Sequence, residues 1–252
     1  MPIVPRIERT YRVRFDEAGA DGHLRSSGYL RYAQDLAWIH SESAGFGRDW
    51  YGSRGLTWLV RSVELEIVGA VVYGAEVTVS TEVVGFRRVW GRRRREFHLH
   101  SNERPVAVAL TDWVLLNSRG MPVRPPEEIL AAFPTPVGGF TPLRLHLPSP
   151  TNASRIEFAA RRSDIDPLGH VNNAAYIDYI DELLAATGRR ADTRHTPHRY
   201  QGEFLAAAEP EMTMLAEAWA ADDAGWHYRL TAGERELFRA RFDSADANWV
   251  GG

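Results

Sequence analysis

Residues 22–35, "GHLRSSGYLRYAQD", and residues 169–182, "GHVNNAAYIDYIDE", are two copies of one pattern, and this repeat decides the fold. The copies align without a gap at a constant offset of 147 residues, from 22 to 169. Internal similarity of this kind is typical of a structural unit that occurs twice in a chain. The positions that agree include a glycine, a histidine and two tyrosines, namely Gly22 and Gly169, His23 and His170, Tyr29 and Tyr176, and Tyr32 and Tyr179.

The residues that flank the two copies also correspond. Each copy is preceded by a stretch of alternating apolar residues, at 11–15 and at 156–160, which predicts a strand. Each copy continues as a helix rich in apolar residues, with Gly45 or Gly188 expected just beyond its end. We therefore expect strand, loop and helix in that order at the start of each copy.

Both helices are followed by strand patterns without another long helix. These patterns lie at residues 55–67, 75–85, 89–100 and 105–118, and again at 198–205, 211–220, 226–232 and 236–243. One long central helix wrapped by an antiparallel sheet is the α+β plan called the hot dog. Because a single copy leaves a sheet edge open, we expect the two tandem hot-dog domains to pair as an intramolecular pseudo-dimer.

The boundary between the two copies is marked by composition. Residues 133–152, "FPTPVGGFTPLRLHLPSPTN", are rich in proline and glycine, as linkers commonly are. We predict an N-terminal hot-dog domain at 1–135, a linker at 136–151 and a C-terminal hot-dog domain at 152–252.

Charge and hydropathy exclude several classes of partner. The net charge is −3, without the basic excess that binding to nucleic acids requires. No apolar run approaches the ~18 residues that span a bilayer, and the first residues, "MPIVPRIERTYRVRF", lack the pattern of a signal peptide. We expect a cytoplasmic chain that binds neither nucleic acid nor membrane.

Two missing residue types narrow the chemistry. The chain contains no cysteine and no lysine, which excludes a thiolate nucleophile, a cysteine-built metal site and a lysine Schiff base. It also lacks the G-x-S-x-G nucleophile elbow. Carboxylate and histidine chemistry without a metal or another cofactor is therefore expected.

The segment "DIDPLGHVNN", residues 164–173, carries the candidate groups of this chemistry. Asp166 could simply begin a turn, or it could orient and deprotonate a water molecule. The first copy has Gly19 at the position of Asp166, whereas His170 has a counterpart in the first copy. Asn172 and Asn173 are expected to cap the following helix, whose N–H groups suit a developing oxyanion.

On these residues the chain resembles the acyl-ACP thioesterase family, tandem hot-dog enzymes of plant plastids and bacteria. The resemblance rests on residues 17–47, 56–67 and 109–129 in the first half, and on 161–180 and, more weakly, 198–204 in the second. It implies that the C-terminal hot dog holds the catalytic groups and that the N-terminal hot dog shapes the acyl-chain pocket.

Matching the family's motif position by position gives a candidate site. The family's aspartate falls on Asp166, its histidine on His170 and its later glutamate on Glu203, whereas its asparagine is Leu168 here. Leucine has no hydrogen-bonding side chain, so Asn172 is the candidate substitute. The expected catalytic residues are Asp166, His170, Glu203 and Asn172, and the expected substrate contacts are Asn173, Trp58, Arg93 and Arg94.

Residues 86–97, "FRRVWGRRRREF", carry six arginines between Arg87 and Arg95. On a strand this run would place several arginines on each face. It could be a solvated sheet edge, or it could dock an acidic carrier protein or a phosphate. The resemblance favours carrier docking.

The sequence thus predicts an acyl-thioester hydrolase that releases fatty acids by water attack. Acyl carrier protein or acyl-CoA would carry the substrate, and the chain would be a monomeric pseudo-dimer or a homodimer. One alternative is a hot-dog enoyl-thioester hydratase or dehydratase. Another is a non-catalytic acyl-binding module, an alternative that Leu168 keeps open.

Overall fold

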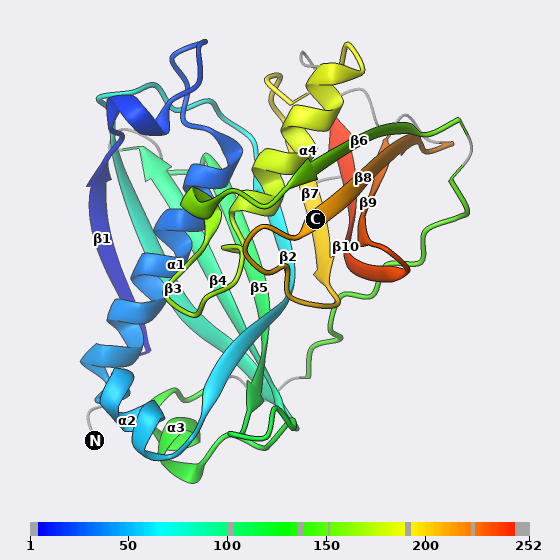
Figure 1. The fold of residues 1–252 in the computed structure, drawn as a ribbon. Coiled ribbons are helices and arrows are strands. Elements are labelled where there is room, and N and C mark those ends of the chain that lie inside the picture. Colours follow the sequence, from blue (N-terminus) through cyan, green and yellow to red (C-terminus); the bar gives the residue numbers. More distant parts are fainter. Residues whose placement is uncertain are drawn as a thin grey trace. The chain divides into compact units, whose positions relative to one another are not determined.

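A computed structural model describes residues 5–99, 103–135, 139–150, 152–189, 193–222 and 225–244 (Figure 1). The chain divides into two compact units. The first comprises Met1–Val63 and Ala70–Leu143, and the second comprises Glu64–Gly69 and Arg144–Gly252. Parts of the expected linker, residues 136–138 and 151, lie outside the described residues.

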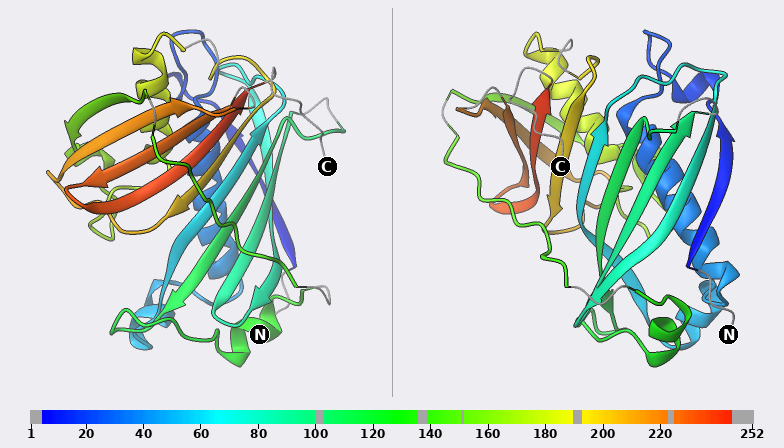
Figure 2. Two further views of the ribbon diagram at one scale, coloured as in Figure 1. Left: turned by 90° about the vertical axis from the view of Figure 1, so that its right-hand side faces the viewer. Right: turned by 180° about the vertical axis from the view of Figure 1, so that it is seen from behind.

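The first unit is an antiparallel sheet with a long helix, α1 (Ser26–Ser43), on one face (Figure 2). The strand order is β1-β3-β4-β5-β2, and α1 packs against β1, β3 and β5. The strands are β1 (Arg6–Arg12), β2 (Thr57–Ile67), β3 (Glu76–Arg87), β4 (Trp90–Leu99) and β5 (Ala107–Leu116). The last four residues of β2 belong to the second unit. A 3-10 turn, η1 (Phe15–Glu17), precedes α1.

The second unit repeats this plan with a shorter helix, α4 (Ala175–Ala186). The strand order is β7-β10-β9-β8-β6, and α4 packs against β6 and β8. The strands are β6 (Ser154–Ala159), β7 (His198–Phe204), β8 (Thr213–Ala220), β9 (Trp226–Ala232) and β10 (Arg235–Ser244). A 3-10 turn, η2 (Arg162–Asp164), precedes α4 as η1 precedes α1. The predicted α+β hot-dog fold is confirmed, and the edge-to-edge pairing of the copies stays a prediction.

Aromatic side chains fix each helix on its sheet. The ring of Tyr29 on α1 lies edge-on to Phe97 with centroids 5.2 Å apart. Its counterpart Tyr176 on α4 contacts Phe204 at 5.1 Å and Phe238 at 5.0 Å. Ring pairs in these arrangements add stability beyond the apolar area that they bury. The duplicated tyrosine is therefore a core residue in both units.

The predicted helix ends are confirmed. Helix α1 ends at Ser43 and α4 at Ala186, and the glycine two residues further on has a positive φ, +90° at Gly45 and +81° at Gly188. Glycine adopts this left-handed conformation without the strain that a Cβ would cause.

The prediction for the first strand was wrong at its end, because Phe15 lies in η1 and not in a strand. The chain turns there because the N–H of Arg14 donates to the carboxylate of Glu17 at 2.8 Å. Two short helices, α2 (Arg48–Ser53) and α3 (Glu127–Ala132), were not predicted. They pack around buried aromatic residues such as Phe46 and Phe133.

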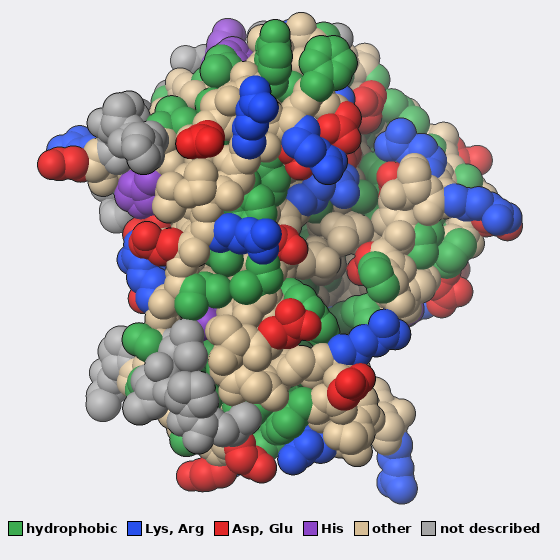
Figure 3. Space-filling view, turned by 90° about the vertical axis from the view of Figure 1, so that its left-hand side faces the viewer, with side chains coloured by type: hydrophobic (Ala, Val, Ile, Leu, Met, Phe, Trp, Pro, Cys, Tyr) green, Lys and Arg blue, Asp and Glu red, His purple; other side chains and the backbone are tan. Residues whose placement is uncertain are grey.

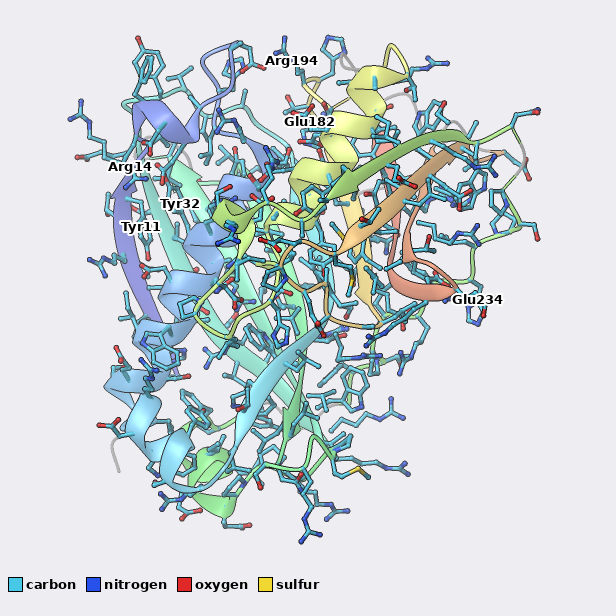
Figure 4. All side chains as sticks on the ribbon, in the orientation of Figure 1. Tyr11, Arg14, Tyr32, Glu182, Arg194 and Glu234 are labelled. Atoms are coloured by element: carbon cyan, nitrogen blue, oxygen red, sulfur yellow. The ribbon has the colours of Figure 1, made fainter. Side chains whose placement is uncertain are left out.

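The same hydrogen bond ties the helix to the preceding turn in both units. The hydroxyl of Tyr32 donates to Glu17 at 2.5 Å, and the hydroxyl of Tyr179 donates to Asp164 at 2.9 Å. Each tyrosine ring also contacts an aromatic ring beside it. Tyr11 and Tyr32 lie next to each other (Figure 4), with their rings stacked and the ring centroids 4.6 Å apart. The rings of Phe158 and Tyr179 meet edge to face, with centroids 4.8 Å apart.

No helix in the described part of the chain has the length and apolar character needed to cross a membrane.

Replacing Tyr179 by phenylalanine tests the role of this hydrogen bond. We expect Tyr179→Phe to lower the free energy of unfolding by about 1–2 kcal/mol, because the partly buried carboxylate of Asp164 loses a donor. Urea denaturation measures the change. The exposed Tyr73 offers a matched control, Tyr73→Phe, with an expected change below about 0.5 kcal/mol. Equal stability of the two variants would contradict this role.

Candidate active site

The loop between η2 and α4 is a tight turn built by backbone hydrogen bonds. Ile165 bridges to Val171, the N–H of Asp166 donates to the carbonyl of His170 at 2.8 Å, and the N–H of Gly169 donates to the carbonyl of Asp166 at 2.9 Å. Gly169 has a φ of +83°, which a glycine accommodates without strain. The turn therefore brings Asp166 and His170, two predicted catalytic residues, together.

The carboxylate of Asp166 has one oxygen fixed by this turn. Its Oδ1 accepts the N–H of Leu168 at 2.8 Å, which is an Asx turn. Within the described ranges, no other hydrogen bond to this half-buried carboxylate is found. Burial, with a smaller contribution from the charge of Asp166, raises the pKa of Tyr176 to about 12. The N–H of Ala208 donates to that tyrosine's oxygen and opposes the rise.

His170 and Leu168 lie on the outer side of the turn. The imidazole of His170 is exposed, and Leu168 is 63% exposed. The side chain of Leu168 therefore points to solvent, and only its backbone N–H contacts Asp166.

The prediction that Asn172 and Asn173 cap the helix was wrong. Helix α4 begins at Ala175 and its N-cap is Ala174, without a capping side chain. Asn172 instead closes the turn before the helix, since its Oδ1 accepts the N–H of Ala174 at 2.9 Å and its carbonyl accepts that of Ala175 at 2.9 Å. Asparagine commonly bonds to the backbone two residues ahead in this way. Asn173 is half-buried within the turn.

The corresponding loop of the first unit has the same backbone geometry. The N–H of Gly19 donates to the carbonyl of His23 at 2.8 Å, the N–H of Gly22 donates to Gly19 at 2.9 Å, and Gly22 has a φ of +79°. The histidines thus share a place in a duplicated turn. The two loops differ in where the carboxylate stands. The second loop has Asp166 where the first has Gly19, whereas the carboxylate of the first loop belongs to Asp21, whose Oδ1 accepts the N–H of His23 at 3.1 Å.

Glu203 is not brought to this turn. On β7 its neighbours Tyr200 and Phe204 contact α4, and the alternation of strand side chains places Glu203 on the opposite face. There it is only 3% exposed, forms an ion pair with Arg144 and accepts the N–H of Leu145 at 3.2 Å. These contacts make Glu203 an anchor for the linker segment.

Asp181 on α4 is a half-buried carboxylate that lies outside the predicted site. The hydroxyl of Tyr200 donates to its Oδ1 at 2.6 Å. Burial raises the pKa of Asp181 to about 8, against the hydrogen bond from Tyr200 and with further help from Asp178 and Glu182. The spacing gave a signal, because position 181 lies one helical turn after the buried Ile177.

The arginine run does not lie at a sheet edge, because β4 pairs with β3 on one side and β5 on the other. Arg93 points to the helix side, where it meets Nδ1 of His40 at 2.8 Å and donates to Oγ of Ser41 at 3.1 Å. Arg93 therefore faces α1 and not the outer face of the sheet, and its contact with a docked carrier stays a prediction. Arg94 points outward and donates to Glu96 at 3.0 Å.

Trp58, the remaining expected substrate contact, is half-buried and belongs to an aromatic cluster. Its Nε1 donates to the hydroxyl of Tyr51 at 3.0 Å, and its ring packs against the buried residues around Phe46.

Charged side chains of both signs are mixed on the surface. On the face seen in Figure 3, arginines and carboxylates are interspersed, so no patch of a single sign covers that face. In the described ranges no three His, Cys, Asp or Glu side chains are grouped to hold a metal ion.

The two units and their matching turns define a tandem hot-dog protein. Residues 6–133 match the acyl-ACP thioesterase N-terminal domain, and residues 148–208 match the acyl-ACP thioesterase C-terminal domain. The chain belongs to the acyl-ACP thioesterase family.

Individual relatives are distant in sequence. An oleoyl-acyl carrier protein thioesterase of the chloroplast from Coriandrum sativum is 22% identical over 191 residues, which are 68% of this chain and 52% of that protein. The chain thus spans about half the length of the curated relatives that it matches.

Solved structures show the same fold. A 12:0-ACP thioesterase from Umbellularia californica has a TM-score of 0.78 at 18% sequence identity, and the match covers 94% of this chain and 96% of that chain. An acyl-ACP thioesterase from Bacteroides thetaiotaomicron has a TM-score of 0.77 at 16% sequence identity, and the match covers 94% of this chain and 98% of that chain.

The raised pKa of Asp181 predicts a pH-dependent stability. The folded state keeps the Asp181 proton up to about pH 8, whereas the unfolded chain releases it at about pH 4. Between these values only the folded state binds the proton, so the free energy of unfolding falls as pH rises. We expect Asp181→Asn, which does not ionise, to flatten this decline in urea unfolding from pH 5 to pH 8. The exposed Glu157 provides the control Glu157→Gln. A decline that is equally steep in wild type and Asp181→Asn would refute the assignment.

Proposed function

We propose that the chain hydrolyses acyl thioesters of acyl carrier protein and releases the fatty acid. The observation that carries the proposal is the Asp166 carboxylate, held in a turn whose duplicate has Gly19 at the same position. Family membership supports the acyl-ACP substrate, and acyl-CoA is the second carrier to compare.

In the proposed reaction Asp166 acts as a general base. Its Oδ1 stays bonded to the N–H of Leu168, so Oδ2 can hold a water and accept its proton. The water oxygen adds to the thioester carbonyl carbon and the C–S bond then breaks. The exposed imidazole of His170, at the other end of the turn, can donate a proton to the departing thiolate.

The carbonyl oxygen gains negative charge when water adds. Helix α4, which begins at Ala175, directs the positive end of its dipole toward the turn and can stabilise that charge. The proposal leaves out Glu203, because Arg144 and the N–H of Leu145 occupy its carboxylate. A cytoplasmic location and the monomeric pseudo-dimer or homodimer state remain predictions from the sequence.

A panel of acyl-ACP and acyl-CoA substrates of several chain lengths tests the proposal, with thiol release as the readout. We expect release from at least one acyl-ACP. Absence of release from every substrate, together with tight binding of the acyl ligand, would instead support a non-catalytic acyl-binding module. Loss of enoyl absorbance without free thiol would support a hydratase.

Replacing Asp166 by asparagine separates catalysis from folding. The amide oxygen of Asp166→Asn can still accept the N–H of Leu168, so we expect the free energy of unfolding to stay within about 0.5 kcal/mol. Loss of the base should lower kcat by about 100- to 10,000-fold. Steady-state thiol release measures the loss, with Glu157→Gln expected to match wild type. A kcat within twofold of wild type would exclude Asp166 as the base.

A further inference from the structure

Strand β4 carries arginines on both of its faces. The contact between Phe97 and Tyr29 of α1 shows which face meets the helix, with ring centroids 5.2 Å apart. Because strand side chains alternate, Arg93 and Arg95 lie on this inner face with Phe97. The inner face of the first unit therefore holds two guanidinium groups.

The arginines on the outer face of the same strand are paired with carboxylates. Nε of Arg92 lies 2.6 Å from Oδ1 of Asp112, and Nη2 of Arg94 lies 2.9 Å from Oε1 of Glu96. These ion pairs neutralise the outer guanidinium groups.

The inner arginines have only neutral partners among the described residues. Arg95, which is 1% exposed, donates to Oγ1 of Thr111 at 2.7 Å. Arg93 meets the imidazole of His40 and the hydroxyl of Ser41. None of these three partners carries a carboxylate.

The electrostatics of the pair are unfavourable without an anion. Burial lowers the pKa of Arg93 to about 10, and burial together with the charge of Arg93 lowers the pKa of Arg95. Guanidinium groups nevertheless keep their proton in proteins. Charges in a desolvated interior are costly unless a counter-charge pairs with them.

Unpartnered donors lie beside the two arginines. Within the described part of the chain, Nε of Arg95, Oγ1 of Thr81 and Nε1 of Trp113 are buried without a hydrogen-bond partner. Thr81 pairs with Arg95 across β3 and β4, and Trp113 pairs with Gly91 across β4 and β5. Paired residues share a face of a sheet, so these donors are on the inner face with the guanidinium groups.

We propose that the inner face of the first unit binds the carboxylate of a ligand with an apolar body, with Arg93 and Arg95 as its cationic partners. A carboxylate offers about four acceptor positions, which suit guanidinium forks and the additional unpartnered donors. The inference goes beyond the proposed function and does not depend on hydrolysis.

The surroundings select the class of ligand. Buried apolar side chains line the same inner face and the adjoining core, including Leu36, Val79, Val83, Phe97 and Phe133. They suit an alkyl chain, and a singly charged carboxylate is less costly to desolvate than a doubly charged phosphate. The carboxylate could belong to a free fatty acid or to the far end of an ω-carboxyacyl thioester.

Calorimetric titration with alkanoates of 8 to 16 carbons, and with the alcohols of equal length, tests the proposal. We expect wild type to bind at least one alkanoate ten or more times more tightly than its alcohol. Arg95→Met should abolish this preference, whereas the control Arg94→Met on the outer face should keep it. A second titration uses ω-carboxyacyl pantetheines. Binding of these thioesters without binding of alkanoates would assign the site to a thioester ligand, whereas binding of alkanoates would assign it to a free acid.

Thermal unfolding without ligand gives an independent readout. Arg95→Met removes an unneutralised buried charge, so we expect its apo Tm to equal or exceed that of wild type while the alkanoate-dependent rise in Tm disappears. If Arg95→Met does not fold, Trp113→Phe should weaken alkanoate binding by about threefold or more. Equal affinity of wild type for alkanoates and alcohols, with ω-carboxyacyl pantetheines also unbound, would overturn the proposal. Retained preference in a folded Arg95→Met, or in Trp113→Phe when Arg95→Met does not fold, would also overturn it.

Discussion

The hydrogen bond from a helix tyrosine to the carboxylate of the preceding 3-10 turn is the constraint on which the site depends. It occurs as Tyr32 to Glu17 in one unit and as Tyr179 to Asp164 in the other. By fixing the turn on the helix, it sets where the following loop starts. In the second unit that loop carries Asp166, so a duplicated structural contact positions a group that is not duplicated.

The repeat made much of the fold predictable, because the pattern of glycine, histidine and tyrosines carries its own strand, loop and helix. The face of Glu203 was not predictable, since it depends on strand register and on the linker segment that supplies Arg144. The burial of Asp181 likewise required its partner Tyr200, which is distant in sequence. Local patterns therefore predicted the turn around Asp166. Contacts between distant segments decide which carboxylates already have hydrogen-bond or ion-pair partners.

The two units have put different polar groups into equivalent architectures. The interior of the second unit holds Asp181 against Tyr200, and that of the first holds Arg93 and Arg95 without carboxylates. Different polar groups at the interior of two copies of one fold indicate that the copies have separate tasks. We infer chemistry at the turn of the second unit and ligand recognition in the first.

The most direct test of the central claim is a single turnover of acyl-ACP in water enriched in ¹⁸O, followed by mass spectrometry of the fatty acid and of the peptide that contains Asp166. If Asp166 activates water, the fatty acid gains one ¹⁸O atom and the peptide gains none. Incorporation of ¹⁸O into Asp166, or a covalent acyl adduct on the protein, would contradict the account.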